Sequence, residues 1–411
     1  MLSAIAAEQL IFTLVRPLTD TEQIPLVATG CLGRVLAAPV SSQLDFPHWD
    51  NSAMDGYAVR AADVVNTPKS LTVVEEIPAG KQPKKTILPG QAARILTGSM
   101  MPEGADTVVM QEETTREGEQ VTILKTPAPQ SFVRHQGSFH QAGAMLLDAG
   151  VRISPAEIAL IAAAGQTQLS VYRQPRVAII STGSELVSPD QPLQPGQIVD
   201  SNQYALSALV AEAGGVPVTL GIVSDEPGDV KSAIKAALSL ADLVISTGGV
   251  SVGDYDYVDA VLEELGATLH VRSVAVKPGK PLTVATFEPS QTGHDQRILY
   301  FGLPGNPASA MVGFWRFVGP AIAKLSGKKA PWAPTFVSAT AATELKAGGR
   351  RETYLWGQLT VDESGYRFSR ATGSHSSGNL VNLANTSGLG VVPQGQTTIA
   401  VGQTVKVLKI R

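Results

Sequence analysis

Two lysines on either side of a short turn are the residues best suited to chemistry. Lys277 and Lys280 enclose Pro278 and Gly279, and Pro281 follows them. Proline restricts the backbone, so this turn holds two ammonium groups with little freedom to drift. Two such cations suit a compact oxyanion, although the segment could also be a solvated turn between two strands. The whole chain carries a net charge of −4, so anion binding needs a local concentration of positive charge of this kind.

Three further turns rich in glycine or proline follow short apolar runs, at residues 181–183, 246–249 and 303–307. Such turns can present backbone N–H groups and hydroxyls to an anion. In an open parallel sheet, ligands bind at the carboxyl ends of the strands. We therefore expect the three turns to meet at one sheet edge and to form an anion site there. The alternative is that they are structural turns only.

Carboxylates accompany these turns. Glu185 follows the first turn, Asp225 ends the next predicted strand, and Asp254 and Asp256 follow the second turn. Mg²⁺ prefers oxygen ligands and is commonly held by one or two carboxylates together with a substrate phosphate. Asp254 or Asp256 could instead cap the helix that follows. The pattern thus predicts a magnesium site and leaves capping open for these two aspartates.

A second group of acids lies near the N-terminal end of the chain. Asp45, Asp50 and Asp55 accompany aromatic and amide side chains in a segment, residues 46–58, that has no helical or strand periodicity. Loops of this kind often carry function, since a rigid scaffold can present their side chains. We therefore interpret the segment as part of a site rather than as a linker.

A rival motif points to a hydrolase. Residues 249–253 match G-x-S-x-G, the nucleophile elbow, and His270, His294 and His375 are available downstream. Three extra residues separate the strand from Ser251, however, and no HGGG-type segment is present. The chain also contains no G-x-G-x-x-G dinucleotide motif and no Walker A motif. The hydrolase stays the weaker hypothesis.

Short strands and helices alternate in the middle of the chain. We expect strands at residues 177–180, 216–223 and 242–245 and helices at residues 201–213, 229–240, 256–265 and 307–325. This alternation predicts βαβ units and a mostly parallel sheet. The residue pattern on either side of this region predicts strands without helices between them. Runs of β-branched residues bounded by glycine or proline lie at residues 71–77, 92–96, 107–111 and 120–124, and again after residue 329.

We therefore predict a multidomain chain of the α/β plus β class, with a central mostly parallel α/β sheet domain. The expected parts are a composite helical domain of residues 1–45 and 140–173, an inserted β-rich module of residues 46–139, the α/β domain of residues 174–328 and a C-terminal all-β domain of residues 329–411. A capping box at Ser154 marks the start of a helix in the composite domain.

Composition excludes several classes of protein. The chain has 411 residues, of which 44% are hydrophobic and 17% charged, so it can form several packed cores. A net charge of −4 argues against a dedicated nucleic-acid binder. The lone Cys31 excludes a disulfide framework and a multi-thiolate metal site. No apolar run reaches about 18 residues, so we expect no membrane span and a soluble, cytoplasmic protein.

Taken together, the motifs resemble those of the molybdopterin molybdenumtransferase family, to which MoeA and the E domain of gephyrin belong. The resemblance runs from about residue 5 to the C-terminus and rests on the order of residues 51–58, 97–98, 181–186, 248–254, 277–281 and 303–307. It implies four domains and an elongated homodimer. The composite domain would serve dimerisation, and residues 174–328 would form the molybdopterin-binding-like domain.

The resemblance also implies an activity: insertion of molybdenum from molybdate into adenylylated molybdopterin, with Mg²⁺-assisted release of AMP. The ligand would be an anionic pterin nucleotide, and other cofactor-biosynthesis proteins are candidate partners, without nucleic acid or membrane. Matching motif positions gives the expected site: Lys277, Lys280, Ser309, Arg350 and Ser376 for molybdate; Gly183, Gly248, Gly249, Ser251 and Pro304 for the pterin ligand; Glu185, Asp225 and Asp256 for the metal and pyrophosphate cleavage; Asp55 and Thr97 from across the dimer interface.

Two residues depart from the family pattern. The family usually has R-x-x-G-x-D after residue 134, where this chain has Phe139 at the acidic position. The family loop S-T-G-D-E-L has Ser184 in place of its aspartate. Both losses would touch the expected cleft. They keep open an alternative function, a catalytically weakened pterin-binding or scaffold paralogue.

Overall fold

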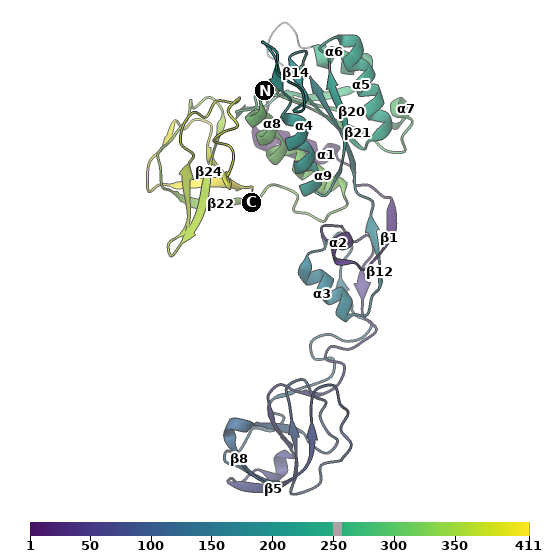
Figure 1. The fold of residues 1–411 in the computed structure, drawn as a ribbon, viewed down its shortest axis with the longest axis vertical. Coiled ribbons are helices and arrows are strands. Elements are labelled where there is room, and N and C mark those ends of the chain that lie inside the picture. Colours follow the sequence, from purple (N-terminus) through teal and green to yellow (C-terminus); the bar gives the residue numbers. More distant parts are fainter. Residues whose placement is uncertain (250–256, 411) are drawn as a thin grey trace. The chain divides into compact units, whose positions relative to one another are not determined.

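The structure, a computed structural model, describes residues 1–249 and 257–410 (Figure 1). The chain divides into two compact units. The first unit comprises Met1–Ala37, Ala149–Ser154 and Leu169–Arg411, and the second comprises Ala38–Asp148 and Pro155–Gln168. The residues of the predicted composite domain are thus shared between both units, and the predicted domain boundaries stay a prediction.

A six-stranded sheet forms the centre of the first unit, in the order β16-β13-β17-β21-β20-β18. Its strands are β13 (Arg176–Thr182), β16 (Val216–Val223), β17 (Leu243–Thr247), β18 (Thr268–Ser273), β20 (Pro281–Phe287) and β21 (Ile298–Leu303). The first four strands in the order are parallel, β20 is antiparallel to β21, and β18 is antiparallel to β20. The predicted α/β class is confirmed.

Helices cover both faces of this sheet (Figure 1). One face carries α1 (Ala4–Leu14), α4 (Asn202–Glu212), α8 (Pro307–Gly313) and α9 (Gly319–Leu325), and the other carries α5 (Pro227–Leu240) and α6 (Tyr257–Glu264). Val177 and Ile179 of β13 pack into the first core, whereas Ala178 and Ile180 pack into the second. Because successive side chains of a strand point to opposite faces, burial on both sides requires the continuous apolar run seen in the sequence.

The single helix predicted over residues 307–325 is interrupted. A π-helical segment, Phe314–Val318, separates α8 from α9, and Pro320 follows it in the first turn of α9. Proline has no N–H group to donate to the carbonyl four residues earlier, so the backbone widens by one residue before it. The segment also buries Arg316, which forms an ion pair with Glu8 of α1.

A second six-stranded sheet occupies the C-terminal part of the first unit, in the order β19-β24-β25-β22-β28-β26. Its strands are β19 (Val276–Lys277), β22 (Phe336–Ala341), β24 (Glu352–Asp362), β25 (Gly365–Arg370), β26 (Gly388–Val392) and β28 (Thr404–Lys409). β24 also pairs with β26, so the sheet closes on itself around Phe368 and its apolar neighbours. The predicted C-terminal β domain is confirmed in type.

Shorter elements complete the first unit: β1 (Thr21–Pro25) with β12 (Gln168–Tyr172), α2 (Ala28–Cys31), β14 (Leu186–Val187) with β15 (Ile198–Val199), α7 (Pro289–Thr292), and β23 (Leu345–Lys346) with β27 (Thr398–Ile399). No helix in residues 1–249 or 257–410 is both long and apolar enough to cross a lipid bilayer.

The second unit is built on a further six-stranded sheet, in the order β7-β4-β6-β5-β9-β8. Its strands are β4 (Gly56–Val59), β5 (Lys69–Ile77), β6 (Gln91–Ile95), β7 (Thr107–Met110), β8 (Thr114–Glu117) and β9 (Gln120–Ile123). Two short pairs, β2 (Val40–Ser41) with β11 (Met145–Leu147) and β3 (Asn51–Ser52) with β10 (Val133–Arg134), and the helix α3 (Pro155–Ala163) accompany it. The β-branched runs of the sequence therefore form the predicted strands.

Candidate functional site

A cavity of about 1100 Å³ lies in the first unit at the carboxyl ends of β13, β17 and β21. The three turns predicted to meet at this sheet edge all line it, together with the two-lysine turn, the start of α4 and parts of the C-terminal sheet. We call it the large cavity. A volume of this size exceeds the roughly 300 Å³ at which ligand pockets begin, so it can accept a nucleotide-sized molecule.

The backbones of the turns after β13 and β17 lie very close to each other and to the end of β21. The amide of Gly248 donates to the carbonyl of Leu303 (3.3 Å), and the hydroxyl of Thr182 donates to the carbonyl of Thr247 (3.2 Å). Gly248 has a φ of +90°, and a Cβ there would lie 2.3 Å from the carbonyl oxygen of Thr182. Only glycine satisfies both conditions, so this position is glycine for a physical reason.

Contacts with both the α/β sheet domain and the C-terminal sheet hold the backbone of the two-lysine turn in place. Lys277 belongs to β19 and is in register with Thr353 of β24, while the carbonyl of Lys280 accepts from the amide of Val274 (3.0 Å). A Cβ on Gly279 would lie 3.5 Å from the carbonyl oxygen of Ser309, whose own side chain is buried. The turn is therefore positioned between the α/β sheet and the C-terminal sheet, and both lysines line the large cavity.

The turn after β21 brings two distant segments to the cavity. The side-chain amide of Asn202 donates to the carbonyl of Gly305 (2.8 Å), which fixes the start of α4 beside this turn. The amide of Ala308 donates to the carbonyl of Ser377 (3.0 Å), which fixes a loop of the C-terminal sheet beside α8. Ser376 thereby joins the lining.

Positive side chains outnumber negative ones in the described lining. The cations are Lys277, Lys280, Lys346, Arg351 and Arg370, and the carboxylates are Glu185, Asp200 and Asp225. Lys346 is paired with Glu344 at 2.8 Å, outside the cavity lining. Although the chain as a whole is acidic, its charge is distributed so that this cavity can attract an anion.

Two of the predicted metal ligands lie at the same edge of the large cavity. Asp225 accepts from the amide of Ser184 (3.1 Å), and its own amide donates to the Ser184 hydroxyl (3.4 Å). The carboxylate of Glu185 lies over Gly183, where a Cβ would come within 2.8 Å of Oε2. Residues 1–249 and 257–410 contain no group of three metal-ligating side chains, so these two carboxylates would need substrate or further oxygen ligands.

Three buried polar atoms of the lining have no hydrogen-bond partner among the described residues: Asp200 Oδ2, Asn202 Oδ1 and His375 Nδ1. An unpaired buried polar atom is costly, so a bound ligand or water would relieve it. Sequence reasoning missed Asp200 and Asn202 as site residues. The available signal was their position at the start of the helix predicted over residues 201–213, the first helix after the turn at residues 181–183.

His375 is held in a defined orientation. Its ring lies 4.5 Å from the ring of Trp356, and its Nε2 lies 2.9 Å from the carbonyl oxygen of Ala371. Burial lowers the pKa of His375, an effect that outweighs the opposing hydrogen bond to Ala371. At neutral pH the ring is therefore uncharged, with Nε2 donating and Nδ1 left as an acceptor.

The predicted residues of the second unit form a pair. The amide and hydroxyl of Thr97 both donate to Asp55 Oδ1, at 2.7 and 2.8 Å. Both hydrogen bonds lower the pKa of Asp55, and the one from the Thr97 amide has the larger effect. The exposed Asp55 therefore stays ionised to more acidic pH than a free aspartate, with its second oxygen available for a ligand.

Other predicted residues fall elsewhere. Arg350 is exposed and does not line the large cavity, whereas its neighbour Arg351 does. Ser251, Asp254 and Asp256 lie outside the described residues. Ser251 is the nucleophile that the hydrolase hypothesis requires. Their expected roles stay predictions.

Three family models cover most of the chain. Residues 2–165 match the MoeA N-terminal region (domain I and II), residues 178–324 match a probable molybdopterin binding domain, and residues 338–410 match the MoeA C-terminal region (domain IV). The turns that meet in the large cavity fall within the second of these matches, and Arg351 and Ser376 fall within the third.

Individual relatives agree with these matches over the full length. The chain is 56% identical over 408 residues to a molybdopterin molybdenumtransferase of Nostoc sp. strain PCC 7120, covering 98% of this chain and 92% of that protein. It is 35% identical to the Haemophilus influenzae protein of the same name, covering 95% and 94%. A solved structure of the molybdopterin biosynthesis MoeA protein from Pyrococcus horikoshii OT3 has a TM-score of 0.81 at 28% identity, with 100% of both chains covered.

Proposed function

Because the chain belongs to the molybdopterin molybdenumtransferase family, we propose that it inserts molybdenum from molybdate into adenylylated molybdopterin, releases AMP and so yields molybdenum cofactor. One observation carries the proposal. A single cavity is lined by two lysines of one turn whose backbone is anchored, by glycine turns at three strand ends and by two carboxylates beside the first of these turns. This combination suits a substrate that carries both an oxyanion and a phosphate chain.

Molybdate would bind to the two-lysine turn. Lys277 and Lys280 would neutralise its charge, and the hydroxyls of Ser309 and Ser376 would hydrogen-bond its oxygens. All four residues line the large cavity. A guanidinium would complete the pocket: the family resemblance assigns Arg350, and the cavity lining offers Arg351. Cations that are already in place stabilise a developing charge without reorganising, which is the largest single effect in many enzymes.

The pterin ligand would lie along the glycine turns. Gly183, Gly248, Gly249 and Pro304 provide backbone without bulky side chains at the strand ends, and Ser251 is expected to join them. Asp200 and Asn202 would use their unpaired oxygens to accept hydrogen bonds from N–H groups of the ligand. These contacts would fix the ligand against the lysine turn and thereby orient the reacting groups.

Mg²⁺ fits the donor set beside the turn after β13. Glu185 and Asp225, with Asp256, would hold it, since this ion is commonly bound by one or two carboxylates and by substrate phosphates. When bound, the ion would supply positive charge to the phosphates whose pyrophosphate bond is cleaved. The Ser184 amide, which donates to Asp225, would keep that carboxylate oriented.

Asp55 and Thr97 are proposed to act in a homodimer, from the second unit of the partner subunit. The Thr97 donors hold Asp55 ionised and leave one of its oxygens available. We further propose that the protein works in the cytoplasm and passes its product to other cofactor-biosynthesis proteins, since molybdenum cofactor must reach the enzymes that use it.

A second candidate function is a pterin-binding or scaffold paralogue with weakened catalysis. The observation that favours it is Ser184, whose hydroxyl occupies a position where the family has an acid beside Asp225. Phe139 is a further departure in the second unit, where its side chain is 71% exposed. Loss of two acids would weaken metal binding while the pterin surface stays intact.

The test is incubation of the purified chain with adenylylated molybdopterin, molybdate and Mg²⁺ while AMP is followed. We expect molybdate-dependent AMP release, and a fall of about 100- to 1000-fold in Lys277→Ala/Lys280→Ala because the fixed cations are lost. Lys81→Ala/Lys235→Ala, which removes two exposed lysines outside the cavity, is the matched control. An unchanged rate in the first variant would refute the lysine assignment, and ligand binding without AMP release would favour the paralogue.

A further inference from the structure

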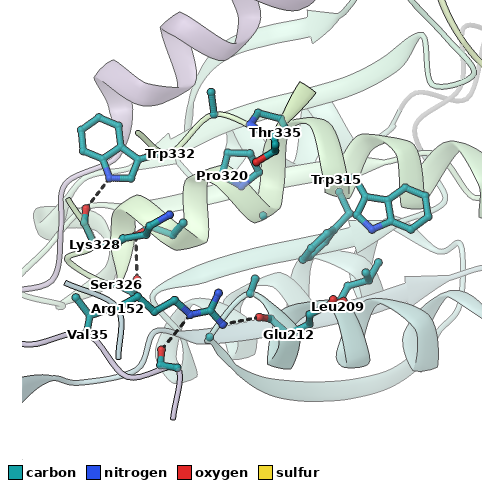
Figure 2. Close-up of a pocket in the computed structure, with 18 of the residues that line it drawn as sticks. Val35, Arg152, Leu209, Glu212, Trp315, Pro320, Ser326, Lys328, Trp332 and Thr335 are labelled. Atoms are coloured by element: carbon teal, nitrogen blue, oxygen red, sulfur yellow. Dashed lines mark hydrogen bonds between the residues drawn. The ribbon is translucent and has the colours of Figure 1, made fainter. Parts of the chain in front are cut away.

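A second, smaller cavity lies in the first unit and shares no described lining residue with the large one. Its volume is about 250 Å³. Three parts of the chain meet there: residues 33–35 with 152 and 172–174; the C-terminal end of α4 with residues 314–328, which include α9; and the C-terminal segments 332–335 and 408–410 (Figure 2). We call it the small cavity. The proposed reaction uses none of its residues.

One part of the small cavity is apolar. Val35, Leu209, Phe314 and Leu408 are buried there, and Pro320 lies among them. The half-buried Trp315 also lines this cavity (Figure 2). Flat and branched apolar groups of this kind favour a planar apolar ligand, because burial of such a ligand removes its surface from water.

Three cations that line the cavity, Arg152, Lys328 and Lys409, have no carboxylate partner among residues 1–249 and 257–410, and backbone carbonyls hold the first two. Arg152 donates through Nε to the carbonyl of Gly33 (3.4 Å) and through Nη2 to the carbonyl of Glu212 (3.1 Å). Lys328 donates from Nζ to the carbonyl of Pro331 (3.4 Å). Each of these two side chains thus contacts carbonyl oxygens only, which satisfies hydrogen bonds but does not neutralise the charge.

Arg152 and Lys328 also act on each other. Burial lowers the pKa of Lys328, and the nearby Arg152 lowers it further. Figure 2 shows both side chains on one side of the cavity and Trp315 on the other. Repulsion between two unneutralised cations is relieved when an anion binds between them, so the pair resembles an anion site more than a structural contact.

The remaining charges of the lining support this interpretation. Arg34 is paired with Glu22, and Arg173 is paired with Asp20 and Asp242, so both are neutralised from outside the cavity. That leaves Arg152, Lys328 and Lys409 against the carboxylate of Glu212, which is exposed and within 4.0 Å of none of them. The local charge is therefore positive.

We propose that the small cavity binds a small organic anion: a carboxylate or phosphate held by Arg152 and Lys328, joined to a single planar apolar ring that packs against Trp315, Leu209 and Pro320. The volume sets the size limit. A cavity of about 250 Å³ lies just below the usual range of roughly 300–1000 Å³, so one ring with one anionic group fits and a dinucleotide does not.

Phenyl phosphate, which combines both parts, is the probe, and isothermal titration calorimetry on the full chain is the measurement. Inorganic phosphate tests the charge alone, and phenol tests the ring alone. We expect phenyl phosphate to bind at least about tenfold more tightly than either, because each part contributes on the order of one tenfold step. Absence of saturable binding at about 10 mM phenyl phosphate, or equal affinity for all three probes, overturns the proposal.

Variants locate the binding. Arg152→Gln/Lys328→Gln should weaken phenyl phosphate binding by about tenfold or more, since two charge-assisted hydrogen bonds are lost. Arg176→Gln/Lys235→Gln removes the same charge from exposed positions outside both cavities and should leave binding unchanged. Equal affinity of both double variants overturns the assignment.

Two further measurements separate this site from the large cavity. Lys277→Ala/Lys280→Ala should bind phenyl phosphate as the unmodified chain does, and a loss there would place the probe in the large cavity and overturn the proposal. The indole fluorescence change on binding should fall in Trp315→Phe, where Trp332 is the indole that still lines the cavity, while thermal unfolding of each variant reports whether it is folded. Persistence of the full fluorescence change in Trp315→Phe contradicts the placement of the ring.

Discussion

The large and the small cavity lie in the same unit, yet different structural elements form them. The large one is formed by turns at strand ends, where backbone groups approach closely and buried oxygens of Asp200 and Asn202 have no partner in the described chain. The small one is formed by helical and C-terminal segments, with an apolar wall and with Arg152, Lys328 and Lys409 as its unneutralised cations. The first suits a large polar substrate and the second a small amphipathic anion.

The difference teaches why motifs reveal one cavity and not the other. A turn that must bring its backbone within reach of a ligand or another turn needs glycine, and glycine is visible in the sequence. The apolar wall of the small cavity consists of residues such as Leu209, Pro320 and Trp315. In the sequence such residues cannot be distinguished from those of an ordinary hydrophobic core. The small cavity therefore leaves no motif, even though its geometry is as defined as that of the large one.

The largest effect expected from a single substitution distinguishes one glycine of each cavity. Gly248→Ala would place a Cβ 2.3 Å from the carbonyl oxygen of Thr182 and should lower AMP release by about 100-fold, because the turn must move. Gly214→Ala in the small cavity has a similar φ of +93°, but its nearest atom is 3.9 Å away. It should lower thermal stability and leave AMP release unchanged.

The prediction is checked by measuring the rate of AMP release and the thermal unfolding midpoint of both variants. Equal loss of activity in the two glycine variants would show that backbone strain, and not close approach in the large cavity, limits catalysis. The comparison would then no longer distinguish the two cavities.

A smaller effect is expected from restoring an acid in the large cavity. Ser184→Asp places a carboxylate beside Asp225 and should lower the Mg²⁺ concentration needed for half-maximal AMP release by about tenfold, with Ser184→Ala as the control. Without Mg²⁺ the two carboxylates repel, so the Ser184→Asp variant should also gain more thermal stability from added Mg²⁺ than the unmodified chain.

Phenyl phosphate binding in the small cavity should be the same in the Ser184 variants and in the unmodified chain. If Ser184→Asp leaves both the Mg²⁺ dependence of AMP release and the thermal gain unchanged, Asp225 does not hold the metal.

The smallest effect concerns pH. The folded chain holds the pKa of His375 below its usual value of about 6.5, mainly through burial, so acidification protonates the unfolded chain first. Stability contributed by the neutral ring is present above about pH 6.5 and is lost as pH falls from there through the lowered pKa. His375→Gln should therefore lose less stability between pH 7 and pH 5.5.

We expect a difference on the order of 1 °C in the pH-dependent change of the unfolding midpoint, because one partly exposed group contributes little. Scanning calorimetry at several pH values measures it. The same pH dependence in His375→Gln and in the unmodified chain would remove His375 as the titrating group of the large cavity.

Much of the fold could be predicted from local patterns. The apolar run at residues 177–180 became β13, and the β-branched runs of the second unit became β5, β6, β7 and β9, because burial and β propensity act residue by residue. The helix over residues 307–325 could not be predicted in detail. Whether a proline such as Pro320 bends, ends or widens a helix depends on what the helix packs against.

For the site, the sequence by itself determined which turns carry glycine, proline and lysine. Glycine permits backbone conformations that other residues avoid, proline restricts the backbone, and lysine carries charge wherever it lies, so Gly183, Gly248, Lys277 and Lys280 could be selected before any fold was known. Only the tertiary structure decided which side chains share a space. Asp200, Asn202 and Arg351 joined the large cavity, and Arg152 met Lys328 in the small one, because packing brings together residues that are far apart in the chain. Proximity of this kind depends on the whole core, and no local pattern encodes it.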